Sequence, residues 1–182
     1  MKKYFPLFGL LLLLSTSCFT SRKNFTLYTK SEVHNMALPI KTNGIYYIND
    51  GNKHYNVSFY ANGLCNYYEL YWGLFFIKND SLMIQYFYVD QESFYKRIVI
   101  ELFGTIINDT SISIYKEKCS RCKNVYFGYE NKTAIVYDEP RVYTFQEQIK
   151  LDSANAWFLN KKWYKKNLRR SATNCTEGDK RF

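Results

Sequence analysis

Two cysteines three positions apart, Cys119 and Cys122, form the one local pattern in the chain that could perform chemistry. A Cys-x-x-Cys pair can be a redox couple, half of a zinc site or a small loop closed by a disulfide. The pair lies in a turn-like region with no helix after it, and only Cys65 and Cys175 remain as further zinc ligands. In an exported protein we expect a disulfide between Cys119 and Cys122. Whether Cys65 and Cys175 pair or stay free is left open.

The other residue types argue against a catalytic site. The two histidines, His34 and His54, lie outside any zinc-protease motif and away from a cysteine or serine nucleophile signature. The chain also lacks a phosphate-binding loop, a dinucleotide fingerprint, a Gly-x-Ser-x-Gly elbow and a calcium loop. We therefore predict no catalytic residue, no metal ligand and no cofactor, and an enzyme is the third of the functions considered.

The first 17 residues have the three zones of an export signal. They comprise a basic head at residues 2 and 3, an apolar run over residues 4–14 and a small polar stretch over residues 15–17, directly before Cys18. A helix that crosses a membrane needs about 20 apolar residues. The apolar run is too short to remain as an anchor, so the sequence predicts a cleaved signal peptide.

The residues before Cys18 resemble a bacterial lipobox, in which small residues precede a cysteine that receives a diacylglyceryl group. Thr16 and Ser17 match this pattern, and Ser15 stands where leucine is usual. The resemblance implies that Cys18 becomes the first residue of a lipoprotein, anchored by acyl chains such as palmitate. The expected location is the cell envelope, at the outer membrane of a Gram-negative bacterium. An ordinary secretory signal cleaved nearby is the alternative.

Size and charge describe the part of the chain after the signal. Removing 17 of the 182 residues leaves 165, which suits one domain. The formal net charge of +9 falls to +7 without the two lysines of the signal. This excess suits a solvated surface, or anionic partners such as lipid head groups or polysaccharide, and export makes nucleic acid the least expected partner. Residues 18–41 are polar and weakly patterned, so we expect a lipid-anchored tether there.

Strand signals follow one another from Gly44 to Glu147. In residues 81–89 β-forming side chains alternate and only Gln85 is clearly polar, so both faces of that strand should be covered. No helical interval is long enough for a parallel crossover. We predict a mainly β domain over residues 42–170, an antiparallel meander of about eight strands closed as a barrel or stacked as a sandwich. Turns rich in Asn, Asp and Gly separate the strands at residues 49–52, 62–63, 78–81 and 107–110.

The end of this domain has a helical period. At about 100° per residue, Trp157, Leu159 and Trp163 share one face, while Phe158 falls among the lysines of the other face. Asp152 or Ser153 is placed to cap the first turn. We expect an amphipathic helix from residue 156 that packs on the sheet or closes one end of a barrel, followed by a polar tail over residues 171–182.

Several stretches between Gly44 and Tyr164 carry a family resemblance. They are Gly44-Ile45-Tyr46-Tyr47, Phe59-Tyr60-Ala61-Asn62-Gly63, Trp72-Gly73, Gly104-Thr105-Ile106-Ile107-Asn108-Asp109-Thr110, and Asp152-Ser153 leading into Trp157 and Trp163. In these stretches the chain resembles small lipoproteins of the Bacteroidetes type, which are similar to lipocalin-like barrels. The resemblance implies a calyx-shaped β-barrel with a C-terminal helix, and it implies no particular activity.

Two non-catalytic functions fit this description. A small antiparallel barrel can enclose one apolar ligand, which inward-pointing aromatic side chains would line. The second function is a structural or interaction lipoprotein that contacts envelope proteins or polysaccharide through exposed Tyr and Lys side chains. The candidates for ligand-lining residues are Trp72, Phe75, Phe87 and Phe103, and a filled core is the alternative for each of them.

Overall fold

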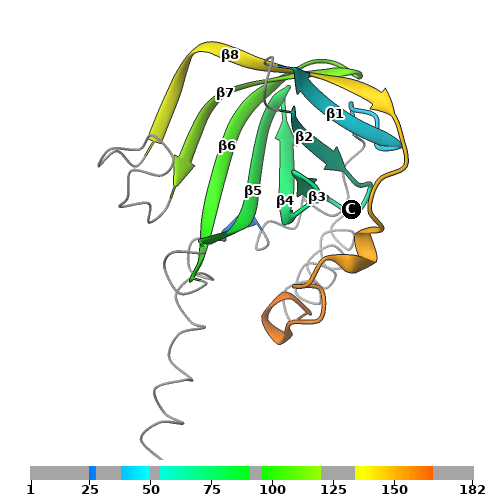
Figure 1. The fold of residues 1–182 in the computed structure, drawn as a ribbon, viewed down its shortest axis with the longest axis vertical. Helices are drawn as coiled ribbons and strands as arrows, with labels where there is room; N and C mark the ends of the chain where they lie inside the picture. Colours follow the sequence, from blue (N-terminus) through cyan, green and yellow to red (C-terminus); the bar gives the residue numbers. More distant parts are fainter. Residues whose placement is uncertain (1–24, 28–37, 50–53, 91–95, 120–133, 166–182) are drawn as a thin grey trace, which may run out of the picture.

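The computed structural model describes residues 25–27, 38–49, 54–90, 96–119 and 134–165. Within these residues, eight antiparallel strands follow one another around a closed barrel, in which β1 also pairs with β8 (Figure 1). The predicted meander of about eight strands is thereby confirmed, with a barrel as its form. The strands are β1 (Gly44–Asn49), β2 (His54–Phe59), β3 (Leu64–Tyr67), β4 (Tyr71–Lys78), β5 (Ser81–Asp90), β6 (Lys96–Asn108), β7 (Ser111–Cys119) and β8 (Ala134–Glu147).

Residues 78–81 and 107–110 both contain Asn-Asp followed by Ser or Thr, but they form two different turns. The turn between β4 and β5 contains Asn79 and Asp80 with φ angles of 48° and 60°, a left-handed backbone that Asn and Asp tolerate better than most side chains. At the turn between β6 and β7, Asn108 follows a register shift, and its side chain accepts the N–H of Thr110 at 2.9 Å. The shared residues therefore reflect turn chemistry and not a structural repeat.

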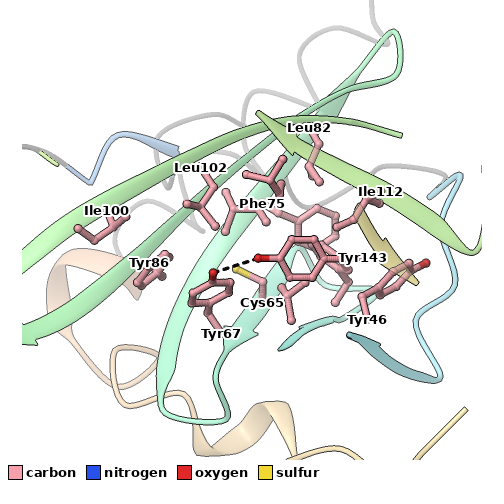
Figure 2. Close-up of a cluster of buried hydrophobic side chains, with 14 of the residues drawn as sticks. Tyr46, Cys65, Tyr67, Phe75, Leu82, Tyr86, Ile100, Leu102, Ile112 and Tyr143 are labelled. Carbon is pink, nitrogen blue, oxygen red and sulfur yellow. Dashed lines mark hydrogen bonds between the residues drawn. The ribbon is translucent and has the colours of Figure 1, made fainter. Parts of the chain in front are cut away.

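Alternate residues of each strand point into the barrel, as the pleat requires. On β5, Leu82, Ile84 and Tyr86 point inward, whereas Gln85 and Phe87 point outward. Figure 2 shows part of the inward set. The buried side chains of this interior cluster are Ile40, Tyr46, Val57, Phe59, Cys65, Tyr67, Phe75, Ile77, Leu82, Ile84, Tyr86, Ile98, Ile100, Leu102, Ile112, Ile114, Cys119 and Tyr143.

A second apolar cluster covers the outer face of the barrel over β3 to β6. Phe158 is completely buried in it, with its ring centroid 5.8 Å from that of Phe25 and 5.9 Å from that of Phe87. Strands β4 and β5 are consequently covered on both faces, which for β5 agrees with the prediction from residues 81–89. The buried residues of this outer cluster are Phe25, Leu27, Tyr60, Leu64, Trp72, Leu74, Phe87, Val99, Ala156, Phe158 and Tyr164.

The segment after β8 packs on the barrel as expected, but it is not one continuous helix. It contains a short 3₁₀ helix, η5 (Ser153–Asn155), then a turn over residues 157–160 and helical residues at 162–165. Asp152 caps η5, because its carboxylate accepts a backbone N–H at 2.9 Å. The prediction that Phe158 lies among the lysines is wrong, since a helical wheel has no meaning where the chain turns.

Part of the expected tether packs against the barrel. Phe25 and Leu27 are completely buried in the outer cluster. The side-chain oxygen of Gln85 accepts the Leu27 N–H at 2.8 Å, and its Nε2 donates to the Thr26 hydroxyl at 3.1 Å. A buried amide needs such partners, so Gln85 explains why this segment lies on β5. Cys18 and the signal residues 1–17 lie outside the described residues.

One end of the barrel is closed by hydrogen bonds and buried side chains. The Tyr46 hydroxyl donates to the Asp109 carbonyl at 2.8 Å. The Lys150 ammonium donates to the Phe59 carbonyl at 2.6 Å and lies 3.9 Å from the centroid of the Tyr60 ring. Burial lowers the pKa of Lys150 to about 8. We call this the closed end, and it contains the turns β2–β3, β4–β5 and β6–β7.

Candidate ligand-binding site

The opposite end of the barrel is rich in inward-pointing tyrosines. Among them Tyr67, Tyr86 and Tyr143 are buried, whereas those closer to the rim are half-exposed. At the closed end Tyr46, Leu82 and Ile112 are almost completely buried, whereas Ile106 and Phe145 are partly exposed. We call the end rich in tyrosines the tyrosine end and define it by Tyr55, Tyr67, Tyr71, Tyr86, Tyr88, Tyr137 and Tyr143, which come from β2, β3, β4, β5 and β8.

Rings from β3, β4 and β5 form a continuous aromatic wall. The Tyr86 centroid lies 4.8 Å from that of Tyr67 and 5.9 Å from that of Tyr71, in stacked arrangements, and Tyr71 is 5.0 Å from Tyr88. Gly73 leaves room for this wall, because a Cβ atom there would lie 2.8 Å from the Cβ of Tyr86. Such offset aromatic pairs stabilise one another and leave flat apolar surface at the rim.

Buried hydroxyl groups cross the interior behind this wall. The Tyr67 and Tyr143 hydroxyls form a hydrogen bond of 3.2 Å, drawn as the dashed line in Figure 2. Burial raises the pKa of Tyr143 to about 12 and that of Tyr67 well above its ordinary value. Both hydroxyls are therefore neutral at physiological pH, and they can donate or accept hydrogen bonds.

A carboxylate and a guanidinium also point inward at this end. The Tyr137 hydroxyl donates to the Glu117 carboxylate at 2.6 Å. Burial, and then the Glu117 charge, raise the pKa of Tyr137. The guanidinium carbon of Arg141 lies 4.2 Å from the centroid of the Tyr137 ring and 4.8 Å from that of Tyr55. These contacts are within the range of cation–π attraction.

The position of Arg141 follows from the register of β8. Arg141 pairs with the inward-pointing Ile114 of β7. β1 pairs with β8 only from residue 144 onward, so residues 134–143 of β8 are held by β7 alone. Figure 1 shows this part of β8 continuing beside β7, away from β1. Arg141 thus lies inside the barrel, beside the unpaired part of its seam.

The turn between β3 and β4, at the same end, has a strained backbone. Tyr68 and Glu69 have φ angles of 57° and 58°, which are uncommon for bulky side chains. The Tyr68 ring lies 5.1 Å from that of Tyr55 and 4.6 Å from that of Tyr67. Strain of about 1 to 3 kcal/mol per residue persists where surrounding contacts enforce it, often at binding sites.

The four phenylalanine and tryptophan residues predicted to line a ligand divide between the two faces. Phe75 points inward and is completely buried, with its ring 4.8 Å from that of Phe59. The prediction is wrong for the other three. Trp72 and Phe87 belong to the outer cluster, and Phe103 points outward with the Lys116 ammonium 5.5 Å from its ring centroid. Because both faces of β4 and β5 are apolar, alternation alone does not distinguish inside from outside.

The cysteines have different states. Cys119 is disulfide-bonded, but Cys122 and Cys175 lie outside the described residues, so the pairing with Cys122 stays a prediction. Cys65 is a free thiol, and its burial in the interior raises its pKa. Within the described ranges, no group of three His, Cys, Asp or Glu residues could hold a metal ion. His54 is the first residue of β2, and His34 is not described.

Comparisons with known proteins give no family for the chain. No family model, no curated protein and no solved structure matches it. In the part of the chain that the structure describes, no helix has the length and apolar character needed to cross a membrane.

Proposed function

We propose that the protein is a lipid-anchored lipoprotein of the cell envelope whose barrel binds a small ligand with an apolar or aromatic body at the tyrosine end. One observation carries the proposal. Four inward-pointing tyrosines at the rim of this end, Tyr55, Tyr71, Tyr88 and Tyr137, are half-exposed. At the closed end the Tyr46 hydroxyl and the Lys150 ammonium instead donate to the Asp109 and Phe59 carbonyls. Ligands of small barrels generally enter at the mouth and lie among inward side chains.

The residue types at the tyrosine end suit such a ligand. Tyrosine presents a large flat apolar face together with a hydroxyl, and it loses little conformational freedom on binding. The stacking of Tyr71 on Tyr86 and its contact with Tyr88 hold these rings in place before a ligand arrives. A preorganised aromatic wall favours binding because fewer side chains must be ordered. The resemblance to lipocalin-like barrels agrees with this function.

Binding can be measured with N-phenyl-1-naphthylamine, an uncharged aromatic probe whose fluorescence rises in apolar surroundings. We expect the purified full chain to bind this probe. Replacement of Tyr71 by alanine should weaken the binding by roughly 3- to 10-fold, because one aromatic contact contributes about 0.5 to 1.5 kcal/mol. Tyr115→Ala is the matched control, since Tyr115 is 40% exposed and lies on β7, where it is not part of the tyrosine end.

The proposal requires that Tyr71→Ala binds the probe more weakly than the control variant Tyr115→Ala does. Equal loss of affinity in Tyr71→Ala and Tyr115→Ala would place the probe on the outer surface. Failure of the full chain to bind the probe would contradict a ligand-binding barrel. Urea unfolding of both variants shows whether a change in affinity reflects lost stability.

The envelope location depends on Cys18 and has its own test. When the full chain is produced in bacteria supplied with a radioactive fatty acid, we expect the protein to carry the label and Cys18→Ala to lose it. Cys65→Ala is the matched control, because Cys65 is a buried free thiol in the interior cluster. Label that persists in Cys18→Ala would contradict the anchor.

A further inference from the structure

We infer that the ligand of the tyrosine end carries an oxyanion, such as a carboxylate, and that Arg141 binds it. This inference rests on the proposed function and adds the chemical class of the ligand. It depends on three observations: two tyrosine rings contact the guanidinium, no hydrogen-bond acceptor binds it among the described residues, and the aromatic wall lies at the same end of the barrel.

The guanidinium of Arg141 has no acceptor within the described part of the chain. Its five N–H groups make no hydrogen bond there, and no carboxylate oxygen lies within 4.0 Å of its nitrogen atoms. The two ion pairs found in these residues are Lys41–Asp109, at 3.9 Å, and Lys118–Glu101, at 3.4 Å. Burial removes part of the water from around this cation, so an oxygen acceptor from a ligand would supply hydrogen bonds to the guanidinium N–H groups.

Two tyrosine rings hold the guanidinium in place without neutralising it. Tyr55 and Tyr137 lie within 5 Å of the guanidinium carbon. The Glu117 carboxylate accepts the Tyr137 hydroxyl and so orients that ring against Arg141. Burial acts to lower the pKa of Arg141, but the electrostatic effect of the surrounding tyrosines outweighs it, so the net shift is upward and the group stays charged. The result is a fixed cation that lacks a direct counter-ion among the residues that the structure describes.

The chemistry of an arginine in this setting favours an oxyanion over other ligands. A guanidinium presents parallel N–H donors that match the two oxygens of a carboxylate or a similar group. The aromatic wall of Tyr71, Tyr86 and Tyr88 lies at the same end of the barrel. An amphipathic ligand, with one oxyanion and a flat or apolar body, would contact both features at once.

Two probes with the same aromatic skeleton distinguish the contribution of the charge to binding from that of the apolar body. N-phenyl-1-naphthylamine is uncharged, and 8-anilino-1-naphthalenesulfonate adds a sulfonate. For the purified full chain we expect the sulfonate to bind more tightly. Arg141→Gln should lower its affinity at least about tenfold, because hydrogen bonds to charged groups are strong, and should change the affinity of the uncharged probe by less than about twofold. Arg141→Lys keeps the charge but loses the parallel pair of N–H donors. Its affinity for the sulfonate should lie between those of the wild-type chain and Arg141→Gln.

The matched control for the lost charge is Lys78→Gln, which removes one exposed cation at the other end of β4. It should leave both affinities unchanged. Equal affinity of the wild-type chain for both probes, or equal effects of Arg141→Gln and Lys78→Gln on sulfonate binding, would overturn the inference and leave the proposed function intact. Failure of the wild-type chain to bind the uncharged probe would contradict the proposed function itself. Retained binding of the uncharged probe by Arg141→Gln shows that the variant is folded.

Discussion

Replacement of Phe158 by alanine is expected to lower the free energy of unfolding by about 3 to 5 kcal/mol, the usual range for removing a buried phenylalanine side chain. Phe158 is completely buried in the outer cluster. Its ring contacts those of Phe25 and Phe87 on the barrel side and that of Tyr164, at 5.1 Å, in its own segment. The alanine variant would leave a cavity among three parts of the chain that are distant in sequence: the N-terminal segment, β5 and the C-terminal segment.

The loss of stability can be measured by urea unfolding of the full chain. Ile149→Ala is the matched control, because Ile149 is 95% exposed and its truncation should change the unfolding free energy by less than about 0.5 kcal/mol. The fluorescence of Trp157 and Trp163 should also change, since both rings lie within 6.2 Å of the Phe158 ring. Equal stabilities of the two variants would show that the C-terminal segment does not belong to the folded core.

Replacement of Gln85 by leucine should lower the free energy of unfolding by about 1 to 3 kcal/mol, the cost of leaving buried polar groups without partners. The Leu27 N–H would lose its acceptor, and the Thr26 hydroxyl would lose a donor. Gln85 also donates to the Glu101 carboxylate, which pairs with Lys118. The change therefore affects both the N-terminal segment and the outer face of β6.

Hydrogen exchange distinguishes this local effect from general loss of stability. The Leu27 amide should exchange faster in Gln85→Leu than the global change in stability explains, because it becomes detached from β5. Gln146→Leu is the matched control, since Gln146 is exposed on β8 and pairs through its backbone with Ile45. Unchanged protection of Leu27 in Gln85→Leu would mean that the segment is held by Phe25 and Leu27 side chains alone.

The strands could be predicted from the sequence because local chemistry specifies them. Alternation on β5 and the Asn-Asp turn before it place Leu82, Ile84 and Tyr86 on one face, and the interior cluster confirms this face. Gln85 is the one polar residue between the two ends of that strand, and its burial on the outer face agrees with the prediction that both faces are covered. The sequence does not say what covers the outer face, since Phe25 and Phe158 are 133 residues apart.

The site was harder to predict because its residue type is common in this chain. With 18 tyrosines in the sequence, no single tyrosine is distinctive, and Trp72 and Phe87 seemed better candidates until the register placed them outside. Arg141 offered the clearest signal, because a charged residue two positions before a buried Tyr143 implies a cation on the inward face. Recognising that signal requires the pairing of Arg141 and Tyr143 with the inward-pointing Ile114 and Ile112 of β7, which is known only from the structure.

If Cys18 carries the proposed lipid, the burial of Phe25 limits how far the domain can stand from the membrane. Phe25 is seven positions after Cys18, and a fully extended chain spans at most about 25 Å over seven residues. With Cys18 in the lipid, the side of the barrel that holds Phe25 must remain close to the head groups. The C-terminal segment that packs on Phe25 exposes Lys161, Lys162 and Lys165. A protein held so closely would have a fixed membrane-facing side, and its orientation would be encoded by the short distance between an acylated cysteine and a buried phenylalanine.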